Sequence, residues 1–291
     1  MKIAALLGSG VVAGSDMSDI LMTQQKAFSP SLGVCTGLQN ANMLSGMGYS
    51  FIEEGVRSFL VPDRPEEEFF EKLKIAKDLK IPVEACNMFL PGNLKSVGRE
   101  AVHQEILEFA ETAFRRAQMA GVKVIVFGSG GSRRIPDGFS REEAFSQFVT
   151  LGRSMAPAAS RYGVVIALEP LNKNECNFIN SLPDGAEIVN AVNHKNYRLL
   201  ADIYHMKMDG EAPGNIEVYG DLICHVHIAE KEGRAAPGTH GEDFSLYFSA
   251  LARINYKGMI SVESRWEDMA LQAPVALSAM MEQIAIARKG L

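Results

Sequence analysis

Four residues of types that commonly bind metal ions follow apolar runs in the second half of the sequence. The runs VVIALE, YRLLAD, ICHVHI and MISVES carry, at or near their ends, Glu169, Asp202, His227 and Glu263. If each run is a strand of one parallel sheet, the four side chains lie at the same edge of that sheet. Packing alone does not explain such a set, because buried carboxylates need polar partners. The pattern predicts a site that binds one divalent metal ion.

The side-chain types indicate the class of metal. Three carboxylates and one imidazole form an oxygen-rich set, which suits Mn²⁺, Mg²⁺ or Co²⁺ better than thiolate-rich structural zinc sites do. Each residue alone has a structural explanation: Glu169 could cap a loop, Asp202 could begin a turn, and Glu263 could pair with a neighbouring arginine. Their occurrence on four consecutive runs favours the shared site.

The loops after these runs are rich in polar residues that could contact a substrate. Glu175, His205 and Arg234 are the candidates, although a turn or surface role is the alternative for each. Asn172 and Asn180 are typical of side chains that stabilise turns.

Two further residues are expected near the same edge. Side chains alternate along a strand, so His225 shares a face with His227 and either supports that residue or packs in the core. Glu53, at the end of the run SFIEEG, is a further pocket candidate.

The elements that position these residues alternate regularly along the chain. Short runs rich in Val, Ile and Leu are separated by longer stretches with helical spacing, which is typical of repeated βα units. There are eight such runs: 32–37, 50–55, 82–87, 123–128, 164–169, 197–202, 223–228 and 259–264. Helices are expected over 65–79, 141–162 and 274–288.

Eight units in this length predict a single-domain (β/α)8 TIM barrel over residues 32–291. A doubly wound sheet is the alternative, but LGVCTGLQN lacks the glycine signature of dinucleotide-binding folds. The glycine-rich segment GSGGSRR (128–134) matches no phosphate-binding pattern either. We expect it to be a flexible loop facing the substrate, with Arg133 and Arg134 solvated or capping it.

Composition excludes some classes of function. The chain has 291 residues, a net charge of −6 and no basic face in its sequence, so we expect no nucleic-acid partner. Its four cysteines are scattered and form no Cys-x-x-Cys pair, which favours reduced thiols. Small substrates with little or no charge fit this composition better.

The first 31 residues are predicted to be an N-terminal extension or a signal segment. Lys2 and the apolar run after it resemble a short signal peptide, with a possible cleavage site at 13–15. A cytoplasmic location is favoured, and export to the periplasm is the alternative. No segment is expected to reach transmembrane length.

The motifs LEPLNKNECNFIN, ADIYHMKMD, HVHIAEKEGRAAPG and ISVE together resemble the xylose isomerase-like barrel superfamily, and within it the D-tagatose 3-epimerase type of ketose 3-epimerase. The resemblance covers residues 32–291. It implies that Glu169, Asp202, His227 and Glu263 bind one metal ion, with Mn²⁺ expected first and Co²⁺, Mg²⁺ or Zn²⁺ as alternatives. It also implies that the two glutamates are the catalytic acid-base pair.

The resemblance also implies that Glu175, His205 and Arg234 bind substrate hydroxyls. Arg234 lies seven residues after His227, one more than is usual in these epimerases, which makes it a weaker match than His205. By analogy with the family, a homodimer or homotetramer is expected.

The expected reaction is epimerisation of a ketose at C3 through an enediolate, in which one glutamate withdraws a proton and the other returns it. Hydroxypyruvate isomerase, inosose dehydratase and aldose-ketose isomerase activities are alternatives on the same scaffold. The endonuclease branch of the superfamily uses a richer set of histidines than the six in this chain. A non-catalytic sugar-binding protein is the last alternative.

Overall fold

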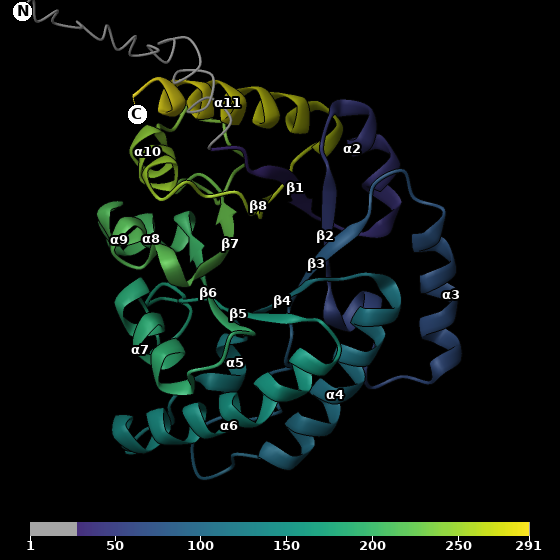
Figure 1. The fold of residues 1–291 in the computed structure, drawn as a ribbon, viewed down its shortest axis with the longest axis vertical. Coiled ribbons are helices and arrows are strands. Elements are labelled where there is room, and N and C mark those ends of the chain that lie inside the picture. The colour runs from purple at the N-terminus through teal and green to yellow at the C-terminus, as the bar shows by residue number, and fades with distance from the viewer. Residues whose placement is uncertain (1–27, 291) are drawn as a thin grey trace, which may run out of the picture.

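The computed structural model of the protein describes residues 28–290. Eight parallel strands form a closed barrel, in which each strand pairs with the next and β8 pairs with β1 (Figure 1). The strands are β1 (Ser31–Cys35), β2 (Phe51–Gly55), β3 (Val83–Asn87), β4 (Val124–Phe127), β5 (Val165–Leu168), β6 (Tyr197–Asp202), β7 (Ile223–Ile228) and β8 (Met259–Val262). The predicted (β/α)8 fold is confirmed, and every predicted run contains a strand or most of one.

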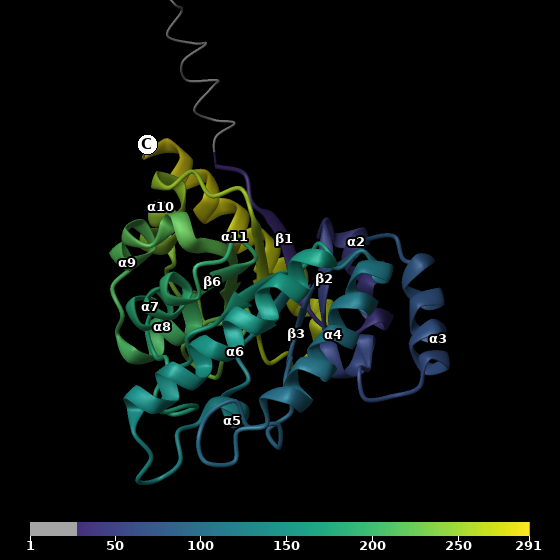
Figure 2. The same ribbon diagram turned by 60° about the horizontal axis from the view of Figure 1, so that its bottom comes forward.

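Helices surround the barrel on its outside, as the two ribbon views show (Figures 1 and 2). The larger ones are α3 (Glu66–Lys77), α4 (His103–Ala120), α6 (Arg141–Arg161), α7 (Leu182–Val192), α10 (Ser245–Arg253) and α11 (Met269–Lys289). Shorter helices are α2 (Ala41–Met47), α5 (Gly130–Arg133), α8 (Ile203–Asp209) and α9 (Gly214–Val218). Single helical turns are η1 (Leu38–Asn40), η2 (Val56–Leu60) and η3 (Gly220–Leu222).

Capping side chains set where several helices begin. The hydroxyl of Ser140 accepts a hydrogen bond from the Glu143 amide at the start of α6, which satisfies a donor that the helix itself cannot. Asp268 caps α11 in the same way, so this helix begins at Met269, five residues before the predicted stretch. Pro274 therefore lies inside the helix rather than at its start.

Two groups of buried apolar side chains lie on opposite faces of the barrel wall. The larger group fills the space between the strands and the helices. The smaller group consists of Ala85, Val124, Val126, Ala167 and Leu200. On β7 the side chains of Val226 and Ile228 belong to the larger group, so the alternating residues His225 and His227 face the barrel interior.

The described chain joins the core before the predicted boundary at residue 32. Phe28 is fully buried, and its carbonyl accepts a hydrogen bond from Arg288 at the end of α11. The segment in which a signal peptide is possible, residues 1–27, lies outside the described residues.

By length and composition, α11 could cross a membrane, so the expectation that no segment reaches that length is wrong for this helix. However, Ala273, Ala276, Leu277 and Met280 of α11 are buried in the core. In the structure α11 therefore packs as the last helix of the barrel.

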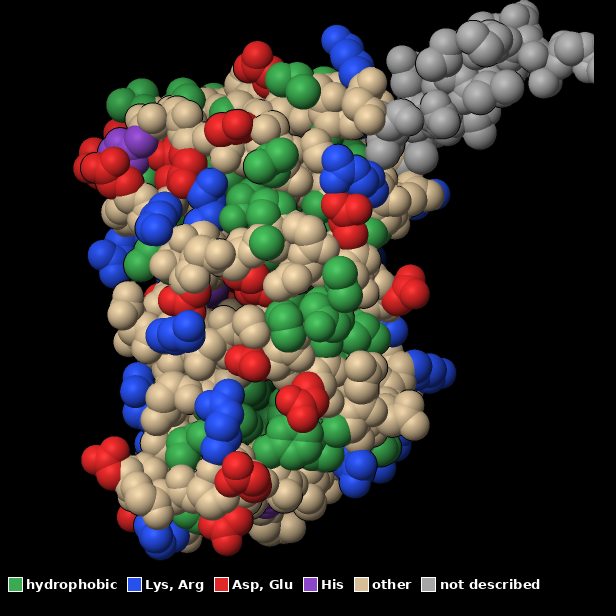
Figure 3. Space-filling view, turned by 90° about the vertical axis from the view of Figure 1, so that its left-hand side faces the viewer, with side chains coloured by type: hydrophobic (Ala, Val, Ile, Leu, Met, Phe, Trp, Pro, Cys, Tyr) green, Lys and Arg blue, Asp and Glu red, His purple; other side chains and the backbone are tan. Residues whose placement is uncertain are grey.

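Charges of both signs are interspersed on the side of the molecule that carries α7, α9 and α10 (Figure 3). No broad basic surface is visible on that face, in agreement with the net charge of −6.

Candidate metal centre

The structure brings the four predicted ligands together at the C-terminal end of the barrel. Glu169 directly follows β5, Asp202 ends β6, His227 is near the end of β7, and Glu263 directly follows β8. One ligand atom from each residue lies within 4.8 Å of those of the other three. The strand ends therefore produce the cluster that the sequence pattern predicts.

The imidazole of His227 faces the three carboxylates through one nitrogen only. Its Nδ1 lies 3.1 Å from Glu169 Oε1, 3.5 Å from Glu263 Oε2 and 3.9 Å from Asp202 Oδ2. Its Nε2 lies 3.0 Å from Oε1 of Glu53 on the other side. A histidine that binds a metal commonly donates its second N–H to a carboxylate, and His227 has this arrangement.

Glu53 is the main residue whose role the sequence did not predict. It lies in the middle of β2, not at its end, and it is fully buried. Its carboxylate contacts Nε2 of both His225 and His227, at 2.7 and 3.0 Å, and accepts a hydrogen bond of 2.7 Å from Ser261. Burial alone would raise the pKa of Glu53, but the two histidines outweigh it and lower that pKa. His225 is thus a supporting residue, one of the two roles predicted for it.

One oxygen of Asp202 provides a direct test of whether a cation fits. Oδ1 accepts a hydrogen bond from the His205 amide and so caps α8. Oδ2 is buried and has no hydrogen-bond partner among the described residues. Its nearest nitrogens are His205 Nε2 at 3.5 Å and the Arg234 guanidinium group at 3.9 Å. A buried carboxylate oxygen without a hydrogen bond is costly, and a divalent cation held by the four side chains would satisfy it.

Space for Glu169 depends on a glycine. A Cβ atom at Gly128, directly after β4, would lie only 2.1 Å from Oε2 of Glu169. Any larger residue at this position would force the Glu169 carboxylate to move.

The two glutamates of the cluster have unlike surroundings. Burial raises the pKa of Glu169. Burial also acts to raise the pKa of Glu263, but the His227 and Arg234 charges outweigh it and hold that pKa at about 2. Asn87, the last residue of β3, donates a hydrogen bond of 3.1 Å to Glu263 Oε1. The sequence did not predict this contact, because it shows Asn87 only as a polar residue at the end of a strand.

The predicted substrate residues line one side of the cluster. His205 is buried, and its Nδ1 lies 2.8 Å from the Asn172 side-chain amide, which can only donate. The proton of His205 is therefore on Nε2, which is buried 3.5 Å from Asp202 Oδ2 and forms no hydrogen bond among the described residues. Asn172 also forms the predicted turn contact, through its Oδ1 and the Asn174 amide.

Arg234 connects two acidic residues at the mouth of the barrel. Its guanidinium group donates to Glu263 Oε2, lies 3.4 Å from Glu175 Oε1, and stacks 4.5 Å from the centre of the Tyr204 ring. The structure thus brings Glu175, His205 and Arg234 to the same side of the cluster. Asn180, in contrast, only stabilises a turn, by donating to two carbonyls.

A buried carboxylate shapes the loop that carries Arg234. Glu230 is fully buried and accepts hydrogen bonds from the amides of Gly238, His240 and Glu242. Arg234 itself has a positive φ of 52°, which a closely held loop must maintain. The sequence marks Glu230 only as one of several charged residues in this loop.

The segment GSGGSRR differs from its prediction. Residues 130–133 form the short helix α5, and Arg133 is fully buried rather than solvated. Its guanidinium group donates to the carbonyls of Phe127, Glu169 and Ile179. It therefore fixes the backbone at the ends of β4 and β5, while Arg134 is exposed and donates to the Glu175 carbonyl.

Comparison with known proteins gives consistent relatives. The chain is 33% identical over 132 residues to L-ribulose 3-epimerase of Methylomonas sp. (strain DH-1), covering 45% of this chain and 46% of that protein. It is 31% identical over 175 residues to a putative hydroxypyruvate isomerase of Homo sapiens, covering 57% and 61%. These alignments span about half of the curated relatives' length.

Solved structures agree in fold. A D-allulose 3-epimerase from Methylomonas sp. in complex with D-allulose has a TM-score of 0.76 at 21% identity, over 88% of this chain and 98% of that one. A 3-keto-D-glucoside 4-epimerase from E. coli has a TM-score of 0.73 at 23% identity, over 87% and 100%. The family model described as xylose isomerase-like TIM barrel matches residues 42–287. The chain therefore belongs to the xylose isomerase-like TIM barrel family.

Proposed function

We propose that the protein is a metal-dependent sugar epimerase that inverts a ketose at C3, with Glu169 and Glu263 as its acid-base pair. The observation that carries this proposal is the convergence of these two glutamates with Asp202 and His227 within 4.8 Å. The names of the relatives, which include L-ribulose 3-epimerase and D-psicose 3-epimerase, support the choice of reaction.

Glu169, Asp202, His227 and Glu263 would hold the metal ion, with Mn²⁺ preferred for this set of oxygen and nitrogen ligands. Such a cation supplies a Lewis acid that polarises the ketose carbonyl and makes the neighbouring C–H acidic. One glutamate then withdraws the C3 proton as a general base. The other returns a proton to the opposite face of C3, so the configuration is inverted.

The surrounding residues orient the sugar. The N–H at Nε2 of His205 and the guanidinium group of Arg234 donate hydrogen bonds to hydroxyl groups. The Glu175 carboxylate accepts them, and its side chain is 41% exposed, so it is open to a ligand. These directional contacts place C3 between the two glutamates.

Proton exchange with solvent tests the proposal. The protein is incubated with Mn²⁺ and a panel of free ketoses in D₂O, and deuterium at C3 and the epimer formed are measured by NMR. We expect exchange in the wild type. In Glu169→Gln and Glu263→Gln we expect a loss of at least about 10³-fold, because general acid-base groups contribute roughly 10²–10⁴-fold. Exchange at the wild-type rate in a variant that carries both substitutions contradicts the assignment of Glu169 and Glu263 as the acid-base pair.

Aldose-ketose isomerisation of a small substrate such as hydroxypyruvate is the second candidate. The alignment with the human putative hydroxypyruvate isomerase, over 175 residues, favours it. The same two glutamates would then move a proton between neighbouring carbons. An assay with hydroxypyruvate separates the two reactions, because a ketose 3-epimerase leaves this substrate unchanged.

A further inference from the structure

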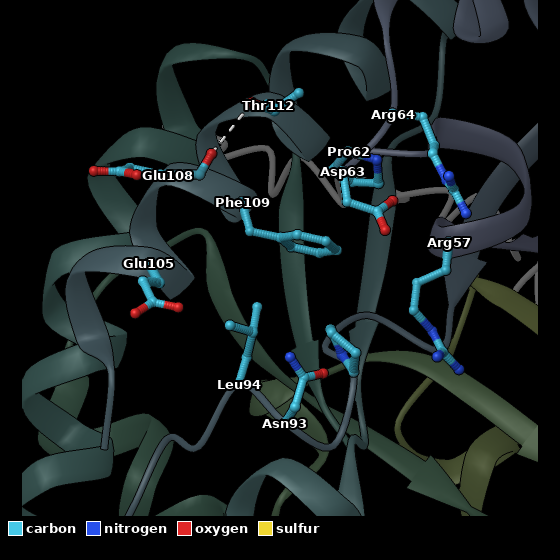
Figure 4. A pocket seen from close by; sticks show the side chains of 11 residues that line it. Arg57, Pro62, Asp63, Arg64, Asn93, Leu94, Glu105, Glu108, Phe109 and Thr112 are labelled. Carbon is cyan, nitrogen blue, oxygen red and sulfur yellow. Dashed lines mark hydrogen bonds between the residues drawn. The ribbon is translucent and has the colours of Figure 1, made fainter. Parts of the chain in front are cut away.

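A large cavity lies outside the cluster of the candidate metal centre. It has a volume of about 680 Å³, within the range of small-molecule sites, and none of the residues that line it is a predicted metal ligand. Figure 4 shows it between the segment after β2, the start of the loop after β3, and the first half of α4. We call this cavity the rim pocket; the lining residues that matter below are Arg57, Asp63, Arg64, Asn93, Glu105 and Phe109.

The rim pocket lies on the same end of the barrel as the metal centre. Its walls follow β2 and β3, and catalytic groups of such barrels lie where the strands end. Asn87 at the end of β3 contacts Glu263, and Pro91 of the pocket wall comes four residues later. Four residues span at most about 14 Å, so the pocket wall begins within that distance of a residue that contacts the metal cluster.

Internal hydrogen bonds hold the walls in place. Arg116 of α4 is 2% exposed and donates to the carbonyls of Leu60, Val61 and Arg64 in the segment after β2. On the other wall, the Ser132 hydroxyl donates to the Leu94 carbonyl. The backbone of the pocket walls therefore does not have to be ordered when a ligand binds, which favours binding.

Four polar side chains of the pocket are free to bind a ligand. Among residues 28–290, the side chains of Arg57, Asp63, Arg64 and Asn93 form no hydrogen bond or ion pair. Figure 4 shows the Phe109 ring extending into the space between the two walls. The pocket thus offers donors, acceptors and one aromatic face.

The balance of charge indicates the class of ligand. The lining contains two guanidinium groups, those of Arg57 and Arg64, and three carboxylates, those of Asp63, Glu105 and Glu108, so the pocket offers little net attraction to a phosphate. A neutral sugar ring suits it better, because each hydroxyl both donates and accepts, and the apolar face of the ring can pack on Phe109.

We propose that the rim pocket binds the second sugar ring of a glycoside whose first ring reacts at the metal centre. This inference rests on the proposed function, because it assigns a substrate class to the same site. The substrate is then a ketose that carries a neutral glycosyl group, rather than a free monosaccharide or a sugar phosphate.

A matched set of ketoses tests the proposal. The three sugars are D-fructose, fructose 6-phosphate and isomaltulose, and all contain the same ketose. The oxygen on C6 carries a phosphate in the second and a glucosyl ring in the third. C3 deuterium exchange is measured for each with Mn²⁺. We expect kcat/KM for isomaltulose to exceed that for fructose by at least about tenfold, the value of one or two hydrogen bonds, with no such gain for the phosphate.

Variants connect the gain to the pocket. Arg57→Ala and Phe109→Leu should each lower the ratio of kcat/KM for isomaltulose to that for fructose by about fivefold or more, because each removes one contact. Lys74→Ala, which removes an exposed cation of α3 outside the pocket, should leave the ratio at its wild-type value. An unchanged ratio in both pocket variants overturns the inference.

Calorimetry separates this inference from the proposed function. If no ketose exchanges its C3 proton, the proposed function fails, and binding alone decides the inference. Isomaltulose should then still bind at least about tenfold more tightly than fructose to the wild type, and this difference should be lost in Arg57→Ala. Equal binding of the two sugars, or tighter binding of fructose 6-phosphate, contradicts a glycosyl pocket.

Discussion

At the scale of single residues, the two oxygens of Asp202 have different partners. Oδ1 caps α8 and Oδ2 faces His227 without a hydrogen bond, so one side chain both ends a strand and offers a ligand atom. Glu53 complements it from the other side of the imidazole. The orientation of His227 thus depends on a carboxylate that does not itself belong to the cluster.

Glu53→Gln should weaken Mn²⁺ binding by about 10- to 100-fold, because partners that orient a ligand typically contribute that much. Calorimetric titration of the metal-free protein measures the affinity. Glu54→Gln is the matched control: its carboxylate accepts the Leu38 and Gly55 amides away from the cluster. Wild-type Mn²⁺ affinity in a folded Glu53→Gln variant contradicts the role assigned to Glu53.

At the scale of elements, loops after the strands carry the substrate residues, and buried charges hold those loops. Glu230 holds the loop of Arg234 through three backbone amides, and Arg116 holds the segment between β2 and α3 through three carbonyls. Removing either side chain takes one partner from three backbone groups, and the cost is larger for Arg116, whose bonds to Leu60 and Val61 are buried.

Glu230→Ala should release the Arg234 loop and raise KM for the sugar by about tenfold, with a smaller effect on kcat, because Arg234 orients substrate. The only tryptophan, Trp266, reports on the loop, since the amide of the preceding Arg265 bonds to the Arg234 carbonyl. Its fluorescence should change in Glu230→Ala and stay constant in Glu232→Ala, an exposed position of the same loop. Equal spectra in both variants would mean that Glu230 does not order the loop.

Arg116→Met should lower the free energy of unfolding by about 3 kcal/mol or more, since the carbonyls of Leu60, Val61 and Arg64 each lose a charged donor that is buried in the protein. Arg115→Met is the control, because Arg115 is 38% exposed and its ion pair with Glu66 is worth less than about 1 kcal/mol. Urea denaturation of both variants gives the comparison. Similar losses in the two variants would contradict the role of Arg116.

At the scale of the whole molecule, local patterns predicted the barrel and the cluster, while contacts between distant segments were not predictable. The apolar runs predict the strands. The Glu, Asp, His and Glu at or near the ends of the last four runs predict that these side chains meet at one edge of the sheet. Glu53 meets His227 across 174 residues, and Asn87 meets Glu263 across 176, so neither contact leaves a mark in the local sequence. The prediction that Arg133 is solvated was wrong, because an arginine beside glycines is typical of an exposed loop. In the structure the carbonyls of Phe127 and Glu169, at the ends of two strands, bind its guanidinium group inside the protein.

The central claim is that the four strand-end residues bind one metal ion on which the reaction depends. It is tested most directly by titrating the metal-free protein with Mn²⁺ and measuring the binding heat and the C3 deuterium exchange on the same samples. The account predicts one Mn²⁺ per chain in the wild type and exchange that rises with occupancy. In Asp202→Asn it predicts binding weaker by at least about 100-fold, because a buried charged ligand is removed. Full exchange in the metal-free protein, or wild-type Mn²⁺ binding in Asp202→Asn, would contradict it.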